Sequence, residues 1–127
     1  MKLIGNNEQD IKFLSELLVE SPLKTNFINI KNNEVSLFLD RYCVELENRD
    51  NGFRCFSCIT FHNTTVLKKN IINTKKLLFL RSIKKMDNYL IIKFMCNSYF
   101  QLKCNDDFFV TFHDLGNKRI YNKMNQF

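Results

Sequence analysis

The segment "SLFLDRYCVELE", residues 36–47, decides how this chain folds. Hydrophobic residues nearly alternate with charged ones along it, a pattern typical of a β-strand that turns one face to the core. Leu39 and Arg41 fall on one side of that strand, whereas Asp40 falls on the other side with Tyr42, where an apolar residue is expected. Because the apolar side changes near Asp40, we predict a β-bulge at Asp40-Arg41.

The strand pattern continues on both sides of this segment. "FRCFSCITF", residues 53–61, alternates in the same way and places Phe53, Cys55, Ser57, Ile59 and Phe61 on one face. Further short strands follow, and the segments between the strands are rich in Asn, Asp and Gly. These residue types favour turns. The predicted strands cover 27–30, 77–83, 89–96, 99–104 and 108–113, and the predicted turns lie at 32–33, 48–52, 86–88, 97–98 and 105–107. Short strands joined in unbroken series predict an antiparallel meander.

One helix is predicted near the start of the chain, in "NNEQDIKFLSELLVES". Asn6 or Asn7 can cap it by accepting a hydrogen bond from a backbone N–H group of the first turn. Its apolar residues recur at a spacing of three to four, which gives one hydrophobic stripe. Ser21-Pro22 is expected to end the helix, because the residue before proline avoids the α conformation.

These elements together predict an α+β fold. The N-terminal helix is expected to pack on a curled antiparallel sheet of about six to eight strands, as a half-barrel or a pleckstrin-homology-like arrangement. A length of 127 residues fits a single domain over residues 1–127, with 118–127 as a candidate mobile tail.

The net charge of +6 is unevenly distributed. Residues 1–50 hold 6 Lys or Arg and 9 Asp or Glu, whereas residues 51–127 hold 13 and 4. The C-terminal part is therefore basic, and pairs such as Lys84 and Lys85 are candidates for a patch that attracts phosphates or an acidic protein surface. Lysines at strand ends also keep sheet edges soluble, which is the alternative interpretation of the same residues.

The 5 cysteines are odd in number and irregular in spacing, which favours thiols in a reducing compartment. Residues 1–18 lack the features of a targeting segment, and no apolar run approaches the roughly 20 residues of a membrane span. We expect a cytoplasmic protein that does not enter a membrane.

No catalytic or metal-binding motif is complete. Cys55-x-x-Cys58 lacks a second pair of ligands, and residues three apart in a strand point to opposite faces. His62 and His113 could act as acid and base only if the fold brought them together with a carboxylate such as Glu45. The 3 glycines are too far apart for a phosphate-binding loop. We therefore expect no catalytic residues, no metal and no cofactor.

Arg41, Tyr42 and Glu45 form an Arg, aromatic and Glu pattern in one strand, and "RCFSCITFHNTTV", which begins at Arg54, follows as the next strand. In these strands and in the order of elements over residues 2–116, the chain resembles the small alphaproteobacterial family known as domain of unknown function 2948. Val44 stands where the family has Trp, so the chain would be a divergent member. The resemblance implies a cytoplasmic bacterial protein and carries over no catalytic residue.

Function is predicted mainly from missing chemistry and from the uneven charge. The leading hypothesis is a non-enzymatic binding or accessory module for a protein partner, as a monomer or weak homodimer. The alternatives are nucleic-acid binding through the basic C-terminal part, or an immunity or inhibitor protein. The candidate binding residues are Arg41, Tyr42, Glu45, Arg54, Lys84 and Lys85.

Overall fold

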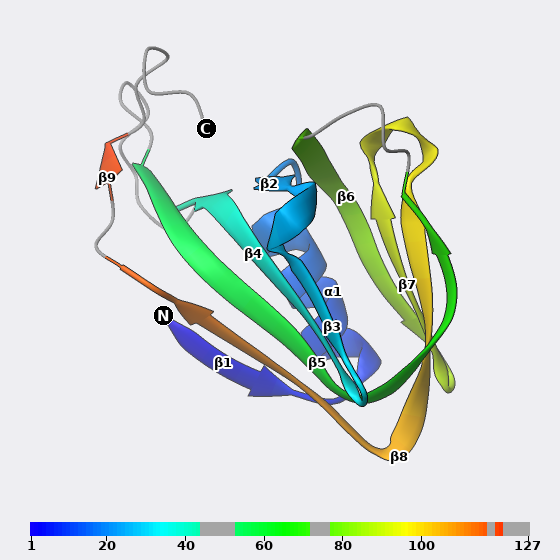
Figure 1. Ribbon diagram of the computed structural model, residues 1–127. Coiled ribbons are helices and arrows are strands. Elements are labelled where there is room, and N and C mark those ends of the chain that lie inside the picture. The colour runs from blue at the N-terminus through cyan, green and yellow to red at the C-terminus, as the bar shows by residue number, and fades with distance from the viewer. Residues whose placement is uncertain (44–52, 72–76, 117–118, 121–127) are drawn as a thin grey trace.

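The computed structural model describes residues 1–43, 53–71, 77–116 and 119–120 (Figure 1). Glu45, the whole turn predicted at 48–52 and most of the tail predicted at 118–127 lie outside the described residues. The elements, in chain order, are β1 (Lys2–Gly5), α1 (Glu8–Leu18), β2 (Pro22–Lys24), a 3₁₀ turn (Thr25–Phe27), β3 (Ile28–Lys31), β4 (Glu34–Tyr42), β5 (Phe53–Asn70), β6 (Leu77–Met86), β7 (Tyr89–Phe94), a second 3₁₀ turn (Met95–Asn97), β8 (Tyr99–Asp114) and β9 (Arg119–Ile120).

The prediction of one helix on an antiparallel sheet is confirmed. The sheet has nine described strands in the order β2-β6-β7-β8-β5-β4-β3, with β1 on β8 and the two-residue β9 on β5. Every pairing is antiparallel, and within the described residues the sheet does not close into a barrel.

Two long strands, β5 and β8, pair along most of their lengths and divide the sheet into two halves (Figure 1). On one side, the first half of β5 pairs with β4, which pairs in turn with β3. On the other side, the second half of β5 pairs with β8, and the sheet continues from β8 through β7 to β6. The predicted meander is therefore wrong at β5, whose neighbours are β4 and β8 rather than β6. This pairing lets the two longest strands bury their apolar residues against each other.

The bend between the two halves falls at a register shift between His62 and Thr64. Asn63 has a φ of 59°, and its side-chain amide donates to the carbonyl of Asp107 at 3.0 Å. The turn predicted at 105–107 is wrong, because these residues belong to the continuous strand β8 opposite the irregularity in β5. Asn and Asp accept such irregular backbone as readily in a bent strand as in a turn.

The β-bulge predicted at Asp40-Arg41 is also wrong. Strand β4 pairs with β5 in unbroken register from Glu34 opposite His62 to Tyr42 opposite Arg54. Arg41 simply follows Val35, Leu37 and Leu39 on the core face, and it is buried like them. The apparent change of side reflected a charged residue in the core and not a change in the backbone.

Helix α1 begins as the sequence predicts and ends earlier. Asn7 is its N-cap: the Asn7 side chain accepts from the backbone N–H of Asp10 at 2.8 Å, and Asp10 reciprocates in a capping box. The helix ends at Leu18, three residues before Ser21, because Glu20 adopts a φ of 66° and its N–H donates to the carbonyl of Leu80 at 2.7 Å. That hydrogen bond fixes the end of the helix on β6.

One hydrophobic core joins the helix to both halves of the sheet. Helix α1 contacts β6 and β4, and Figure 1 shows it crossing between these strands. The core comprises Ile11, Leu14, Leu17 and Leu18 of the helix together with sheet residues such as Leu37, Phe61, Leu80, Ile92, Phe100 and Phe112. None of the described helices is long and apolar enough to span a membrane.

Candidate functional site

Arg41, the first candidate from the sequence, is held in the core by Asp114 at the end of β8. Its Nε donates to Asp114 Oδ1 at 2.8 Å, and its Nη2 donates to Asp114 Oδ2 at 2.9 Å. Ser57 Oγ donates to the same carboxylate at 2.6 Å, as does the amine of Met1 at 3.0 Å. The guanidinium is fully buried, so these contacts are structural and offer no surface to a ligand.

The charge of Asp114 is stabilised by the groups around it. Burial by itself raises the pKa of this carboxyl, but hydrogen bonds from Arg41, Ser57 and the Met1 amine outweigh burial and hold the pKa well below its usual range. Asp114 therefore remains ionised at neutral pH and balances the buried charge of Arg41.

Tyr42 and Arg54 also form part of the structure of the sheet. Arg54 lies over the ring of Tyr42, with its Cζ 4.5 Å from the ring centroid, and its Nη2 donates to the Tyr42 hydroxyl at 2.7 Å. Asp40 lies on the same face and accepts from Arg54 Nη1 at 3.5 Å. These cross-strand contacts link β4 to β5. The third candidate of this group, Glu45, lies outside the described residues.

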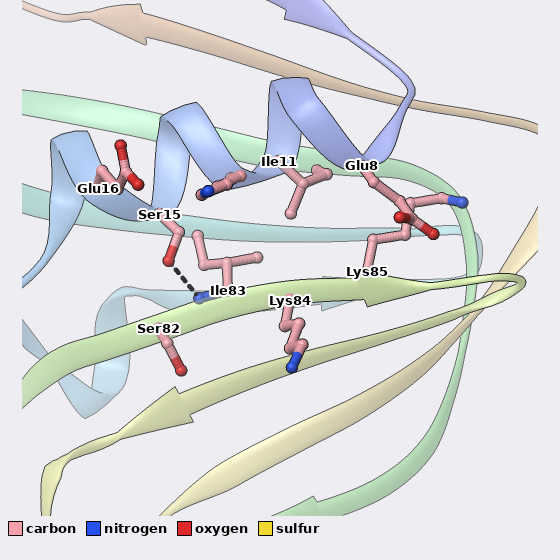
Figure 2. A pocket seen from close by; sticks show the side chains of 9 residues that line it. Glu8, Ile11, Ser15, Glu16, Ser82, Ile83, Lys84 and Lys85 are labelled. Atoms are coloured by element: carbon pink, nitrogen blue, oxygen red, sulfur yellow. Dashed lines mark hydrogen bonds between the residues drawn. The ribbon is translucent and has the colours of Figure 1, made fainter.

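Lys84 and Lys85 point to opposite sides of β6 (Figure 2). Lys85 is directed toward helix α1, into a groove of about 370 Å³ between the helix and β6. Ser15 spans this groove by accepting a hydrogen bond from the backbone N–H of Ile83 at 2.9 Å. Glu8, Glu16, Lys12 and Lys85 contribute charges of either sign, so the groove does not select for ligands of one charge.

Lys84 belongs to the outer face of the sheet, opposite the helix. Alternation along β6, β7, the first half of β8 and the second half of β5 buries residues such as Ile83, Ile92 and Phe100 and leaves their neighbours outside. The outward residues form three cross-strand rows: Met86, Tyr89, Lys103 and Thr65; Lys84, Ile91, Gln101 and Lys68; and Ser82, Lys93, Tyr99 and Asn70. We call these twelve residues, with Arg81, the basic face.

The basic face carries positive charge without balancing negative charge. Residues 64–70, 77–86, 89–94 and 99–104, which build it, contain no Asp or Glu. Within the described residues, none of its five cations forms an ion pair; they are Lys68, Arg81, Lys84, Lys93 and Lys103. The sequence indicated a basic C-terminal part, but only the strand pairing gathers these side chains on one face.

A shallow pocket of about 230 Å³ opens at one end of the basic face. It is lined by Arg81, Lys93 and Tyr99, and by Phe94, Asn97 and Ser98 of the adjoining turn. Asn97 has a φ of 66°, and a hydrogen bond from the Phe94 N–H to the Ser98 carbonyl, 2.9 Å long, closes this turn. Two cations and the Tyr99 ring therefore meet in one hollow, beside Phe94.

The histidines do not come together. His62 accepts from or donates to the Thr111 hydroxyl at 2.8 Å, its Nδ1 lies 3.7 Å from Glu34, and its ring stacks on Phe109. His113 lies opposite Cys58, several residues further along the same pair of strands. Glu34, His62 and Thr111 form a row on an open strand face. Most backbone N–H groups there bond to the neighbouring strand, so few remain to bind an oxyanion.

The thiols are mostly inside the protein. All five cysteines are thiols, of which Cys43, Cys55, Cys58 and Cys104 are buried and Cys96 is exposed. Burial raises the pKa of the Cys58 and Cys104 thiols, although Thr60 and Lys85 respectively oppose the shift. In the part of the chain that the structure describes, no cluster of three or more His, Cys, Asp or Glu side chains could hold a metal ion.

The fold and these surfaces together define an α+β protein with a basic outer sheet face. No family model, curated protein or solved structure matches the chain. Its resemblance to the domain of unknown function 2948 family stays a prediction.

Proposed function

We propose that this chain is a non-enzymatic binding module and that the basic face is its binding surface. The observation that carries the proposal is a set of five cations that form no ion pair within the described residues. They lie on four adjacent strand segments, 64–70, 77–86, 89–94 and 99–104, that contain no acid. A cluster of like charges lowers the stability of the folded protein slightly and favours an anionic partner. A partner that covers this face must therefore present negative charge.

The other candidate residues support this choice of surface. Arg41 is fully buried against Asp114, and Arg54 contacts Asp40 and Tyr42, so each has a partner within the protein. Lys84, in contrast, is exposed and lies in the middle row of the basic face. Lys84 is therefore a binding residue in this proposal, whereas Arg41 stabilises the core.

Several expectations from the sequence accompany this proposal. A protein partner, an immunity or inhibitor role and a cytoplasmic location are compatible with a basic binding face. We also propose the half-barrel or pleckstrin-homology-like arrangement for the curl of this sheet, and that arrangement by itself implies no function.

Recovery of partners from an extract of the native host, with and without nuclease, tests the proposal. The wild-type protein should retain an anionic partner, and the variant K84E/K93E/K103E should lose it. The control K2E/K12E/K31E makes the same change in net charge at exposed lysines elsewhere and should retain the partner. Equal recovery by both variants, or no anionic partner with the wild type, would refute the proposed surface.

A further inference from the structure

The basic face interleaves aromatic rings with its cations. Tyr89 on β7 lies opposite Lys103 on β8, and Tyr99 on β8 lies opposite Lys93 on β7. Tyr89 is 47% exposed, and Tyr99 is half-buried at the rim of the shallow pocket. Each tyrosine thus has a lysine directly opposite it on the neighbouring strand, whose backbone lies about 5 Å away across the sheet.

The arrangement of rings and charges also has a direction. The two tyrosines lie in the outer rows, and Gln101 lies in the row between them, flanked by Ile91 and Lys68. A ligand that starts at Tyr89 on β7 and passes diagonally onto β8 would meet the Gln101 amide next and then Tyr99. Lysines would lie along both sides of this path. At the far end it would reach the pocket that holds Arg81 and Lys93.

Single-stranded nucleic acid has the matching chemistry. Its phosphates pair with lysine and arginine, its unstacked bases stack on exposed aromatic rings, and an amide can bond to a base edge. A duplex would present phosphates to the cations but would keep its bases away from the tyrosines. An acidic protein surface would satisfy the cations and leave no specific use for the interleaved rings.

We propose that the basic face binds single-stranded nucleic acid, with bases on Tyr89 and Tyr99 and phosphates on Lys68, Lys84, Lys93 and Lys103. The pocket of Arg81, Lys93 and Tyr99 holds one nucleotide at the end of this path. This inference rests on the proposed function, because it names the anionic partner of the same face.

Binding of fluorescently labelled oligonucleotides, followed by anisotropy over a range of salt concentrations, tests the inference. The full-length protein should bind a single-stranded DNA or RNA of about 12 nucleotides more tightly than a duplex of the same sequence. This length lies within the roughly 4–16 nucleotides that one single-strand-binding OB domain covers. The logarithm of the association constant should fall with the logarithm of the salt concentration with a slope of about −3, as four phosphate contacts on a single strand imply.

Two sets of variants separate stacking from charge. Y89L/Y99L should weaken single-strand binding at least about tenfold, because stacking contributes to binding at each base, and should leave binding of inorganic polyphosphate unchanged. K84E/K93E/K103E should abolish binding of both ligands, and K2E/K12E/K31E should bind single strands far better than that variant. Thermal unfolding of each variant checks that the fold is intact.

The possible outcomes distinguish this inference from the proposed function. Equal affinity for single strands and duplex, with no effect of Y89L/Y99L, would show only non-specific attraction of polyanions and would overturn the inference. Binding of polyglutamate but not of oligonucleotides would also overturn it, while an acidic protein partner would then fit the proposed function. Failure to bind any of these polyanions would count against both.

Discussion

Arg41 lies on the core face of β4 directly after Leu37 and Leu39, and its side chain is fully buried. A buried charge is tolerated only where a partner and hydrogen bonds replace the water it has lost. Asp114 provides that partner from the end of β8, and Ser57 from β5 completes the cluster. The three strands β4, β5 and β8 are thus joined at one point by polar contacts inside the core.

Removal of Asp114 is expected to be costly. Asp114→Ala should lower the free energy of unfolding by about 3–5 kcal/mol, because Arg41 keeps its charge in the core without its partner. The double variant Arg41→Met/Asp114→Leu should recover most of that loss, since an apolar replacement of a buried ion pair is often neutral. Urea denaturation at neutral pH measures both, and an equal loss in the double variant would contradict this account.

The same carboxylate predicts a pH dependence. Its pKa in the folded protein is below that of an unfolded chain, so its contribution to stability is complete above the unfolded value of about 3.9 and is lost as the pH falls toward the folded value. The difference in stability between wild type and Asp114→Asn should therefore narrow between about pH 5 and pH 2. Asp106→Asn, at an exposed position of β8, serves as the control and should show a smaller pH-dependent difference.

At the scale of elements, helix α1 covers one edge of β6. The opposite edge of β6 pairs with β7. β6 pairs with β2 only at Leu77 to Phe79, and further along this edge Leu80 and Ile83 bond to residues at the end of α1 and within it. An uncovered strand edge is a template for pairing with another chain, so the helix has a protective role as well as a place in the core. The groove of Figure 2 is the seam of this contact.

Asn63 determines where β5 bends, and its substitution should be sensitive to backbone geometry. Asn63→Ala loses the hydrogen bond to Asp107 and places a residue with Cβ at a φ of 59°, whereas Asn63→Gly loses only the hydrogen bond. The alanine variant should therefore be less stable than the glycine variant by about 1 kcal/mol. At Thr65, an exposed strand position without positive φ, glycine should instead be the less stable of the two. Thermal unfolding of the four variants measures this order, and the same order at both sites would contradict it.

At the scale of the whole molecule, the two halves of the sheet differ in their outer faces. On the half built on β4, Arg54 pairs with Asp40, and the ring of His62 lies close to Glu34. On the half built on β6 and β7, the outward lysines form no ion pair within the described residues, and one core between helix and sheet supports both halves. This asymmetry is the physical basis of the proposed binding surface.

The core also controls the reactivity of the thiols across the molecule. Only Cys96 should react rapidly with an aromatic disulfide reagent in the native protein, because Cys43, Cys55, Cys58 and Cys104 are buried. All five should react after denaturation, and Cys96→Ser should remove the rapid reaction. A second rapidly reacting thiol in the native protein would show that the core opens more readily than its packing indicates.

Much of the fold could be predicted because its signals are local. The alternation of residues 53–61 predicted the two faces of β5, and Asn7 with Asp10 marked the start of the helix.

The site was less predictable. Lys84 was identified, but Lys93, Lys103, Tyr89 and Tyr99 were missed, since only the pairing of β6, β7 and β8 places them in adjoining rows.

The sequence by itself determined the helix and its start at Asn6 or Asn7, the alternation of residues 53–61 and the excess of positive charge after residue 50. The tertiary structure alone decided that β5 pairs with β8, that Arg41 meets a carboxylate 73 residues away, and that lysines from four strand segments share one face. The reason is the distance along the sequence over which each signal acts. Helix caps and strand alternation depend on residues a few positions apart, whereas strand pairing depends on which distant apolar faces can be buried together.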